Sequence, residues 1–262
     1  MLRRIQIIAS DFRGLIHVCG WCVALRWLAA IFIRFPACQR AGNLQPADAA
    51  IGDGPIRVRK GNARAMLGCE RVLTGIRETW VRDEYLGGGY LRINPDALVV
   101  DLGANMGGVT ALALAHGPQV RVMAVEADPN ECRRFEKTMA LNGWSSRARL
   151  INAFVGGRTR DQEKLLATDR ASDVPTISQG ELLALTGGKI DFLKCDIEGS
   201  EFELCAGGAP LLAAAEQIAM EVHPHAGDAN GLVDFVKGMG FEVRVIYHAP
   251  TVMLLARRPE RR

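Results

Sequence analysis

Residues 97–107 read ALVVDLGANMG, and this stretch decides the predicted fold. It opens with a continuous apolar run over residues 97–100, which is typical of a strand buried on both faces of a sheet. A turn containing glycines follows the run, and residues 109–116 then have the pattern of a helix. A buried strand, a turn and a helix in this order form the repeating unit of a parallel α/β sheet.

The rest of the chain continues this alternation of strands and helices. Further strands are predicted at residues 120–125, 148–151, 190–195, 217–222, 241–247 and 251–256, and helices at 129–142, 181–185, 200–212 and 231–239. The segment between the last two strands is too short for a parallel crossover, so one of them must run antiparallel. We predict an α/β fold with a Rossmann-like sheet of seven strands, mostly parallel with one antiparallel strand at the end, and helices on both faces.

The turn after the first of these strands is the predicted ligand site, because ligands of such sheets bind at the carboxyl ends of the strands. Asn105 stands where the dinucleotide pattern G-x-G-x-x-G requires a glycine, so a pyrophosphate would meet a side chain. Asp101 ends this strand and Glu126 ends the next one. Carboxylates at these places suit a ligand that carries cationic groups and ribose hydroxyls, and they predict S-adenosylmethionine. The predicted cofactor-binding residues are Asp101, Gly103, Ala104, Asn105, Gly107, Glu126, Ala127, Asn152, Ala153 and Asp196.

A second group of charged residues follows the fourth and fifth predicted strands: Lys194, Asp196, Glu198, Glu201, Glu221 and His223. Here the sequence resembles the FkbM family of methyltransferases. The matching stretches are VDLGANMG at 100–107, VEADP at 125–129 and IDFLKCDIEGSE at 190–201, with weaker matches at 174–178 and at Glu221-x-His223. The sequence departs from the family at Gly108-Val109, where an aromatic residue is common, at Ala127, where proline is usual, and at Cys195, where an aliphatic residue is usual.

The resemblance implies a class I methyltransferase fold and an activity. We expect an S-adenosylmethionine-dependent methyltransferase that O-methylates a hydroxyl of a sugar, a glycolipid or another natural product. The alternative is a non-catalytic domain of the same fold that binds the cofactor or a partner. The residues also leave two further functions open, a nicotinamide oxidoreductase and a membrane-tethered scaffold.

A hydroxyl must lose its proton when it is methylated, so a general base is required. Asp196 and His223 are the candidates, and Lys194 could keep Asp196 ionised or lower the pKa of the hydroxyl. One alternative is that Lys194, Glu198 and Glu201 form an ion-pair network that shapes the loop. Another is a divalent cation held by Asp196, Glu198 and Glu221, since hard cations prefer oxygen ligands. We expect no metal.

The N-terminal region lies outside the resemblance. Residues 15–33 form an apolar run interrupted by His17 and Arg26. As one helix the run would span about 28 Å, close to the thickness of a bilayer core, but an arginine at its middle is costly there. Three interpretations stay open: a helix that lies on or anchors in a membrane, a buried helix in a cap or dimer, and a signal peptide.

We divide the chain into an apolar helical segment at 1–40, a linker and N-terminal cap at 41–95, and a methyltransferase domain at 96–258. Residues 40–55 are rich in alanine, glycine, proline and aspartate and predict a linker, whereas 56–67 predict a hairpin. Residues 156–178 are polar and irregular. We expect the segments at 40–95 and 156–180 to shape the acceptor pocket.

Composition limits the partners and the compartment. A net charge of +3 is too weak to predict nucleic-acid binding. Seven cysteines with neither a disulfide framework nor a zinc spacing fit a reducing compartment. We therefore expect a cytoplasmic protein, with membrane contact through residues 15–33, whose partner is a small-molecule or glycan hydroxyl acceptor. The sequence leaves the oligomeric state open.

Overall fold

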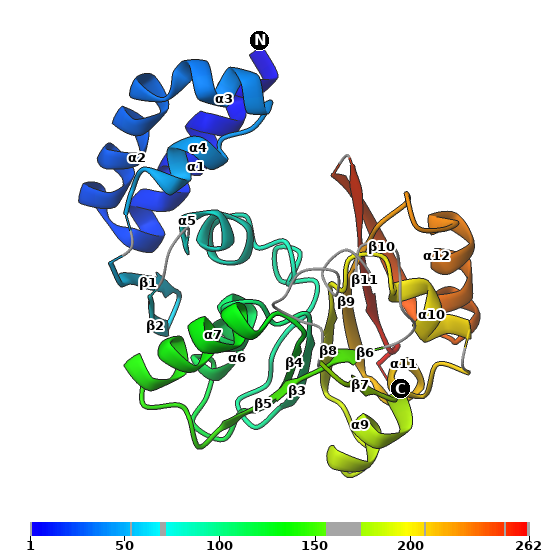
Figure 1. Ribbon diagram of the computed structural model, residues 1–262. Helices are drawn as coiled ribbons and strands as arrows, with labels where there is room; N and C mark the ends of the chain where they lie inside the picture. The colour runs from blue at the N-terminus through cyan, green and yellow to red at the C-terminus, as the bar shows by residue number, and fades with distance from the viewer. Residues whose placement is uncertain are drawn as a thin grey trace.

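A computed structural model describes residues 2–52, 54–68, 72–155, 174–206, 208–248 and 250–260. Its centre is a seven-stranded sheet in the order β10-β11-β9-β8-β3-β4-β5 (Figure 1). The strands are β3 (Leu98–Leu102), β4 (Arg121–Glu126), β5 (Ala148–Asn152), β8 (Phe192–Cys195), β9 (Gln217–Val222), β10 (Glu242–His248) and β11 (Thr251–Arg257). Most of the polar segment predicted at 156–178, namely residues 156–173, lies outside the described residues.

The sheet has the predicted strand directions, with one difference in strand order. β11 runs antiparallel to both of its neighbours, β9 and β10, while every other pair in this sheet is parallel. The antiparallel strand was predicted at the end of the sheet, but it lies second from the edge and β10 lies outside it. The short connection between the two strands predicts a hairpin, and a hairpin alone does not determine which of its strands is the edge.

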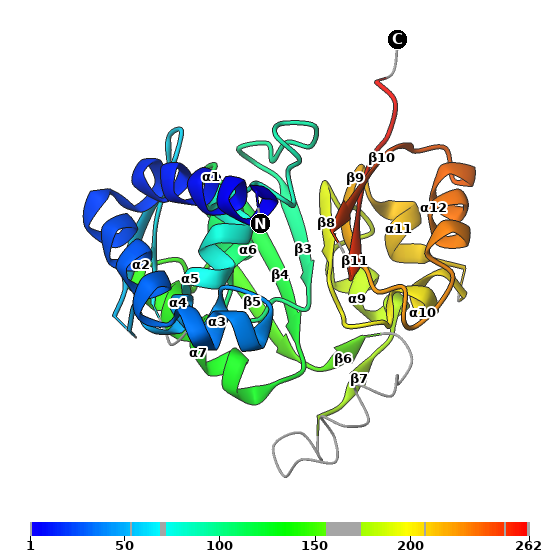
Figure 2. The ribbon, with the colours of Figure 1, turned by 90° about the horizontal axis from the view of Figure 1, so that it is seen from above.

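Helices cover both faces of the sheet because successive strand residues point to opposite sides. Val99 and Val122 belong to the core that packs under α6 and α7, whereas Val100 and Met123 belong to the core under the later helices. The two groups of helices lie on opposite sides of the sheet in both views (Figures 1 and 2). The helices of the two layers are α6 (Gly108–Leu114) and α7 (Pro129–Leu141), and α9 (Gln179–Leu185), α10 (Glu201–Ala206), α11 (Pro210–Ala214) and α12 (Ala229–Gly238).

The N-terminal residues form a helical cap on the side of α6 and α7. The apolar run at 15–33 is not one helix. Helix α1 (Leu2–Cys19) ends before Gly20, and α2 (Trp21–Ile33) begins after it. Gly20 has a φ of 90°, a backbone conformation that glycine adopts without strain. Two short helices follow, α3 (Phe35–Ala41) and α4 (Gln45–Ala49). The prediction of a linker was wrong for α4, because Ala47 and Asp48 are buried.

Within the described residues, no single helix is both long and apolar enough to cross a bilayer. Only α2 and α3 taken together reach that length and composition, and the two are bent by 77° relative to each other.

The cap continues into the rest of the chain through the predicted hairpin, which is confirmed. β1 (Ile56–Lys60) pairs with β2 (Ala63–Leu67) antiparallel. The short helix α5 (Val72–Gly75) and the π-helical turn η1 (Ile76–Val81) follow. Two small strands, β6 (Phe154–Val155) and β7 (Thr176–Ile177), form a separate parallel pair beside the main sheet.

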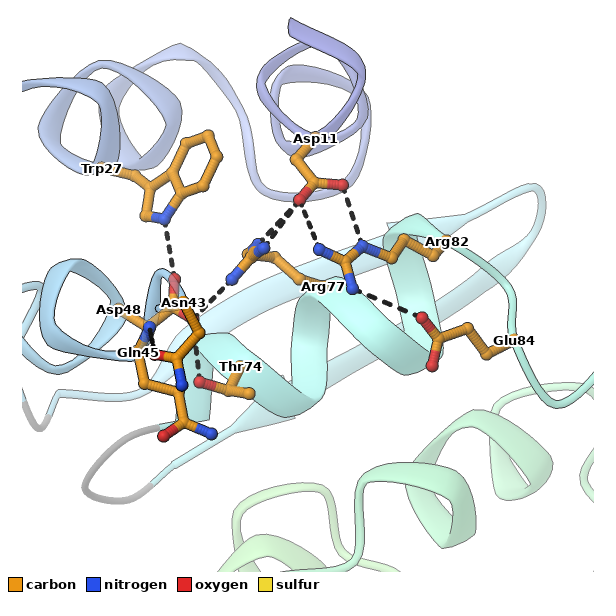
Figure 3. A network of polar contacts seen from close by, with 9 residues as sticks. All are labelled: Asp11, Trp27, Asn43, Gln45, Asp48, Thr74, Arg77, Arg82 and Glu84. Carbon is orange, nitrogen blue, oxygen red and sulfur yellow. Dashed lines mark hydrogen bonds and ion pairs between the residues drawn. The ribbon is translucent and has the colours of Figure 1, made fainter. Parts of the chain in front are cut away.

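A buried charge network attaches the cap to η1 (Figure 3). Arg77 of η1 donates to Asp11 of α1 at 2.7 Å and to Asp48 of α4 at 2.6 Å. Arg82 donates to the same Asp11, and Trp27 of α2 donates to Asp48. Arg77 therefore joins α1 to α4, and Trp27 connects α2 to the same network through Asp48.

Candidate active site

The predicted cofactor loop lies between β3 and α6, and it contacts the loop that follows β8. Gly103 has a φ of 70°, and a Cβ atom built there would lie 1.7 Å from the carbonyl oxygen of Asp196. A side chain at this position is therefore excluded twice, by backbone conformation and by space. Asn105 and Gly107 also have positive φ angles, of 49° and 85°. The loop can take this shape only with glycine at Gly103, where it contacts the backbone of Asp196.

Lys194, the third residue of β8, holds the two loops together. Its ammonium donates to the carbonyl oxygens of Leu102 at 3.0 Å and Gly103 at 2.5 Å. It also lies 3.3 Å from Asp101 Oδ1 and 3.9 Å from Asp196 Oδ2. Burial by itself lowers the pKa of Lys194, but the charges of the two aspartates outweigh that effect and raise it above its ordinary value. Lys194 is therefore a buried cation that fixes the cofactor loop.

Asp101 is fully buried and faces the interior of the loop. Its Oδ2 accepts a hydrogen bond from the Thr110 hydroxyl at 2.7 Å, and its Oδ1 faces Lys194. Asp101 does not line the cavity described below. In this arrangement it compensates the charge of Lys194, so we assign it a positioning role.

Four of the predicted cofactor-binding residues, Glu126, Ala127, Asn152 and Ala153, lie together at the ends of β4 and β5. Both carboxylate oxygens of Glu126 accept backbone N–H groups, from Asn105 at 2.8 Å and from Asp128 at 2.7 Å. Burial raises the pKa of Glu126 despite these hydrogen bonds. The amide nitrogen of Asn152 donates to the carbonyls of Glu126 and Ala127, and the Ala153 N–H donates to Glu126 as well. The structure thus brings this group against the cofactor loop through the Asn105–Glu126 contact.

His223 and two glutamates form a cluster at the ends of β8 and β9, next to Asp196. Glu201, fully buried, accepts the N–H groups of Ile197 and Gly199 and lies 3.0 Å from His223 Nδ1. His223 Nε2 lies 3.4 Å from Glu198 Oε2. Burial by itself lowers the pKa of His223. The hydrogen bond to Glu201 and the charges of the surrounding carboxylates outweigh that effect and raise the pKa to about 9. His223 is therefore protonated at neutral pH and bridges two carboxylates.

The residues that could hold a divalent cation differ from the set considered in the sequence analysis. The ligand atoms of Asp196, Glu198 and His223 all lie within 4.8 Å of one another, and Glu221 is not in that group. A histidine must be neutral to bind a metal. With a pKa of about 9, His223 would have to release a proton to serve as a ligand at neutral pH.

A cavity of about 550 Å³ opens beside the cofactor loop, between it and the cap. This is a typical size for a small-molecule site. Its floor includes Gly103, Ala104, Asn105, Lys194 and Asp196, and its opposite wall comes from α3, α4, α5 and η1. Five predicted site residues therefore share one cavity, while Glu126, Ala127, Asn152, Ala153 and His223 lie outside its lining.

Sequence reasoning did not identify Tyr85 or Glu78, which line the same cavity. The Tyr85 hydroxyl donates to Asp196 Oδ2 at 3.1 Å. Burial and the charge of Asp196 raise the pKa of Tyr85 well above its ordinary value, so it remains a donor. Burial, Glu84 and Glu221 raise the pKa of Glu78 to about 8, and burial and Asp196 raise that of Glu221 to about 7. No periodic pattern in residues 76–92 marks these side chains.

These features fit a cationic nucleoside ligand. Bare backbone at Gly103 forms part of the cavity floor, and burial, followed by neighbouring carboxylates, raises the pKa values of Glu78 and Glu221. A positively charged ligand beside these groups would favour their ionised forms. Strongly perturbed acids in a cavity are also typical of functional sites.

The model of the methyltransferase FkbM domain matches residues 101–243, more than half of the chain. The chain belongs to the FkbM methyltransferase family. It is an S-adenosylmethionine-dependent methyltransferase, and S-adenosylmethionine is its cofactor. The sheet order, with its antiparallel strand next to the edge, is that of the class I methyltransferase fold. No curated protein matches the chain significantly in sequence.

Several solved structures resemble this chain at low sequence identity. Precorrin-6y C5,15-methyltransferase from Geobacter metallireducens GS-15 is 18% identical, with 68% of this chain and 88% of that one covered and a TM-score of 0.45. The Methanococcus jannaschii fibrillarin pre-rRNA processing protein is 13% identical, with 79% and 91% covered and a TM-score of 0.47. The N-terminal domain of EvdMO1, with SAH bound, is 17% identical, with 71% and 81% covered and a TM-score of 0.43. Likeness at this level supports no inference about the acceptor.

Proposed function

We propose that this enzyme methylates a hydroxyl oxygen of a sugar, glycolipid or other natural product, with Asp196 as the general base. The observation that carries the proposal is the position of Asp196. Its carboxylate lines the cavity beside the cofactor loop, and its Oδ2 accepts the Tyr85 hydroxyl at 3.1 Å. A base in this place is what an alcohol acceptor requires, because an alcohol is a weak nucleophile until it loses its proton.

The residues around Asp196 support this role. The Lys194 ammonium lies 3.9 Å from Asp196 Oδ2, and the Tyr85 hydroxyl fixes the orientation of the same oxygen. The other oxygen, Oδ1, would then take the proton of the acceptor hydroxyl. Bound S-adenosylmethionine supplies a methyl group activated by its sulfonium charge. We assign the base to Asp196 in preference to His223, because His223 is protonated at neutral pH and engaged with Glu198 and Glu201.

The outer wall of the cavity supports a hydroxylated acceptor. It presents the amide side chains of Asn43 and Gln45 and the hydroxyl of Thr74, set among aliphatic residues such as Leu67 and Val72. Amides and hydroxyls both donate and accept hydrogen bonds, as sugar hydroxyls require.

The test is a transfer assay with labelled S-adenosylmethionine and a panel of sugar, glycolipid and other hydroxyl acceptors, followed by location of the methyl group. Asp196→Asn should lower kcat about 10²- to 10⁴-fold, the range expected for a general base. The same variant should keep its affinity for S-adenosylhomocysteine in calorimetry. The matched control is Asp234→Asn, which changes an exposed aspartate paired with Lys237 on α12.

Two results would overturn the proposal. A methyl group found on nitrogen or carbon would exclude O-methylation. A wild-type protein that binds S-adenosylhomocysteine but modifies no acceptor, with Asp196→Asn indistinguishable from it, would favour the non-catalytic binding domain.

A further inference from the structure

The cap carries an outward apolar face that the active site does not use. Among the described residues, eleven large hydrophobic side chains are well exposed, and seven of these lie between Ile5 and Phe35. Isolated exposed hydrophobic residues are ordinary, but a concentrated group marks an interaction surface. The exposed apolar surface of the described residues is therefore concentrated on the first three helices.

Helix α2 supplies the centre of this surface. Trp21, Leu25 and Phe32 recur at a helical spacing and are 63%, 52% and 73% exposed. The opposite side of the same helix buries Ala24, Trp27 and Ala30 in the core. The helix thus has an inner apolar side that is packed and an outer apolar side that is not.

Helix α1 and the start of α3 extend the surface. The ring of Phe12 on α1 packs edge-on against Trp21, with centroids 6.4 Å apart. Ile33 and Phe35 continue it around the bend at Arg34. We call this set the cap face: Ile5, Phe12, Trp21, Leu25, Phe32, Ile33 and Phe35.

The charge around the cap face is of one sign. From residue 5 to 50, the exposed charged side chains are Arg13, Arg26, Arg34 and Arg40. The only acids in this range, Asp11 and Asp48, are buried in the network with Arg77. Residues 1–50 contain six arginines and two aspartates, a net +4, while the other 26 basic and 27 acidic residues give −1. The whole positive surplus of the protein therefore belongs to the cap.

We infer that the cap face docks on an anionic membrane surface. Helices that combine exposed aromatic and aliphatic side chains with arginines are typical of the bilayer interface, where the apolar side enters the headgroup region and cations meet anionic lipid. A second copy of the chain fits less well, because a symmetric contact would bring the four arginines of each copy together.

Docking would also place the cavity near the lipid. Helix α3 begins at Phe35 in the cap face and ends at Ala41, which lines the cavity, so the two are separated by a seven-residue helix about 10 Å long. If the proposed hydroxyl methylation holds, this geometry favours an acceptor presented at the membrane surface, such as a glycolipid headgroup. The docking itself does not depend on that function.

The experiment is sedimentation of the full chain with vesicles of phosphatidylcholine alone and of phosphatidylcholine mixed equally with phosphatidylglycerol. We expect binding to the anionic vesicles that weakens with added salt. Trp21→Ser and Phe32→Ser should each reduce the binding constant about tenfold. Arg34→Gln should reduce it about fivefold. The matched control is Phe235→Ser, which removes an exposed aromatic from α12 on the far side of the molecule (Figure 2).

Each variant is also tested for its thermal midpoint and for S-adenosylhomocysteine affinity, which should match the wild type because the changed side chains are exposed. Equal sedimentation of wild type and Phe32→Ser would overturn the inference, and so would equal binding to neutral and anionic vesicles. A concentration-dependent dimer that Phe32→Ser abolishes would assign the cap face to a second copy instead. Because none of these readouts measures methyl transfer, they stand apart from the test of the proposed function.

Discussion

Replacement of Arg77 by methionine should undo the attachment of the cap. In the native protein, Arg77 is 5% exposed and contributes hydrogen bonds to Asp11 at 2.7 and 3.1 Å and to Asp48 at 2.6 Å. Methionine retains much of the apolar volume but leaves two buried carboxylates without this cation. Asp11 keeps Arg82 as a partner, at 2.8 and 3.0 Å. Asp48 keeps only neutral donors among the described residues, Trp27 at 2.7 Å and Thr74 at 2.8 Å.

The magnitude follows from that difference between the two aspartates. Removal of one partner from a buried ion pair typically costs about 3–5 kcal/mol. Since Asp11 remains paired and Asp48 does not, we expect Arg77→Met to lower the free energy of unfolding by about 3 kcal/mol, the low end of that range. The assay is urea denaturation followed by both tryptophan fluorescence and circular dichroism, so that separate unfolding of the cap would be visible as non-coincident transitions.

Two further variants make the explanation testable. Adding Asp48→Asn to Arg77→Met should recover about 1 kcal/mol or more, because it removes the uncompensated charge and keeps a polar group for Trp27. Lys237→Met, which breaks an exposed pair with Asp234, should cost less than about 0.5 kcal/mol. A loss below about 1 kcal/mol for Arg77→Met, or no recovery in the double variant, would refute the reasoning.

Two predictions concern the active site. The pKa of Glu78 is about 8 in the folded protein and 4.5 in the unfolded chain. Between these pH values the folded state holds more protons than the unfolded state, so the contribution of Glu78 to stability falls as the pH rises. Glu78→Gln should therefore make the thermal midpoint less dependent on pH in that window, and an unchanged pH dependence would contradict the assignment. Tyr85→Phe removes the hydroxyl that donates to Asp196 and should lower kcat roughly ten- to a hundredfold with little change in S-adenosylhomocysteine affinity. A wild-type kcat would show that Tyr85 does not position the base.

The sheet could be predicted from sequence because its strands are buried on both faces. Residues such as Val99, Val100, Leu193 and Met220 are fully buried and lie in short apolar runs, and such runs need no knowledge of distant contacts to recognise. The order of the strands at the edge of the sheet was harder to predict. The hairpin of β10 and β11 was evident from its short connection, but the choice of inner strand depends on pairing with β9, which is a tertiary contact.

The cap and part of the site could not be predicted for similar reasons. An apolar run specifies burial or contact but not where the backbone bends, and here the bend depends on Gly20 and Arg34. Tyr85 reaches Asp196 across 111 residues of sequence, from a segment without periodicity. Asp101 was predicted to end its strand and is the penultimate residue of β3, but only its three-dimensional surroundings reveal that it faces Lys194 and does not line the cavity.

The direct contact between Gly103 and the carbonyl group of Asp196 limits how this enzyme could be re-engineered. No side chain separates the two segments, so a substitution that displaces one would disturb the placement of both cofactor and base at once. Libraries that aim at a new acceptor should leave this junction intact and randomise Asn43 and Gln45, which lie across the cavity and contact neither Gly103 nor Asp196 in the described hydrogen bonds.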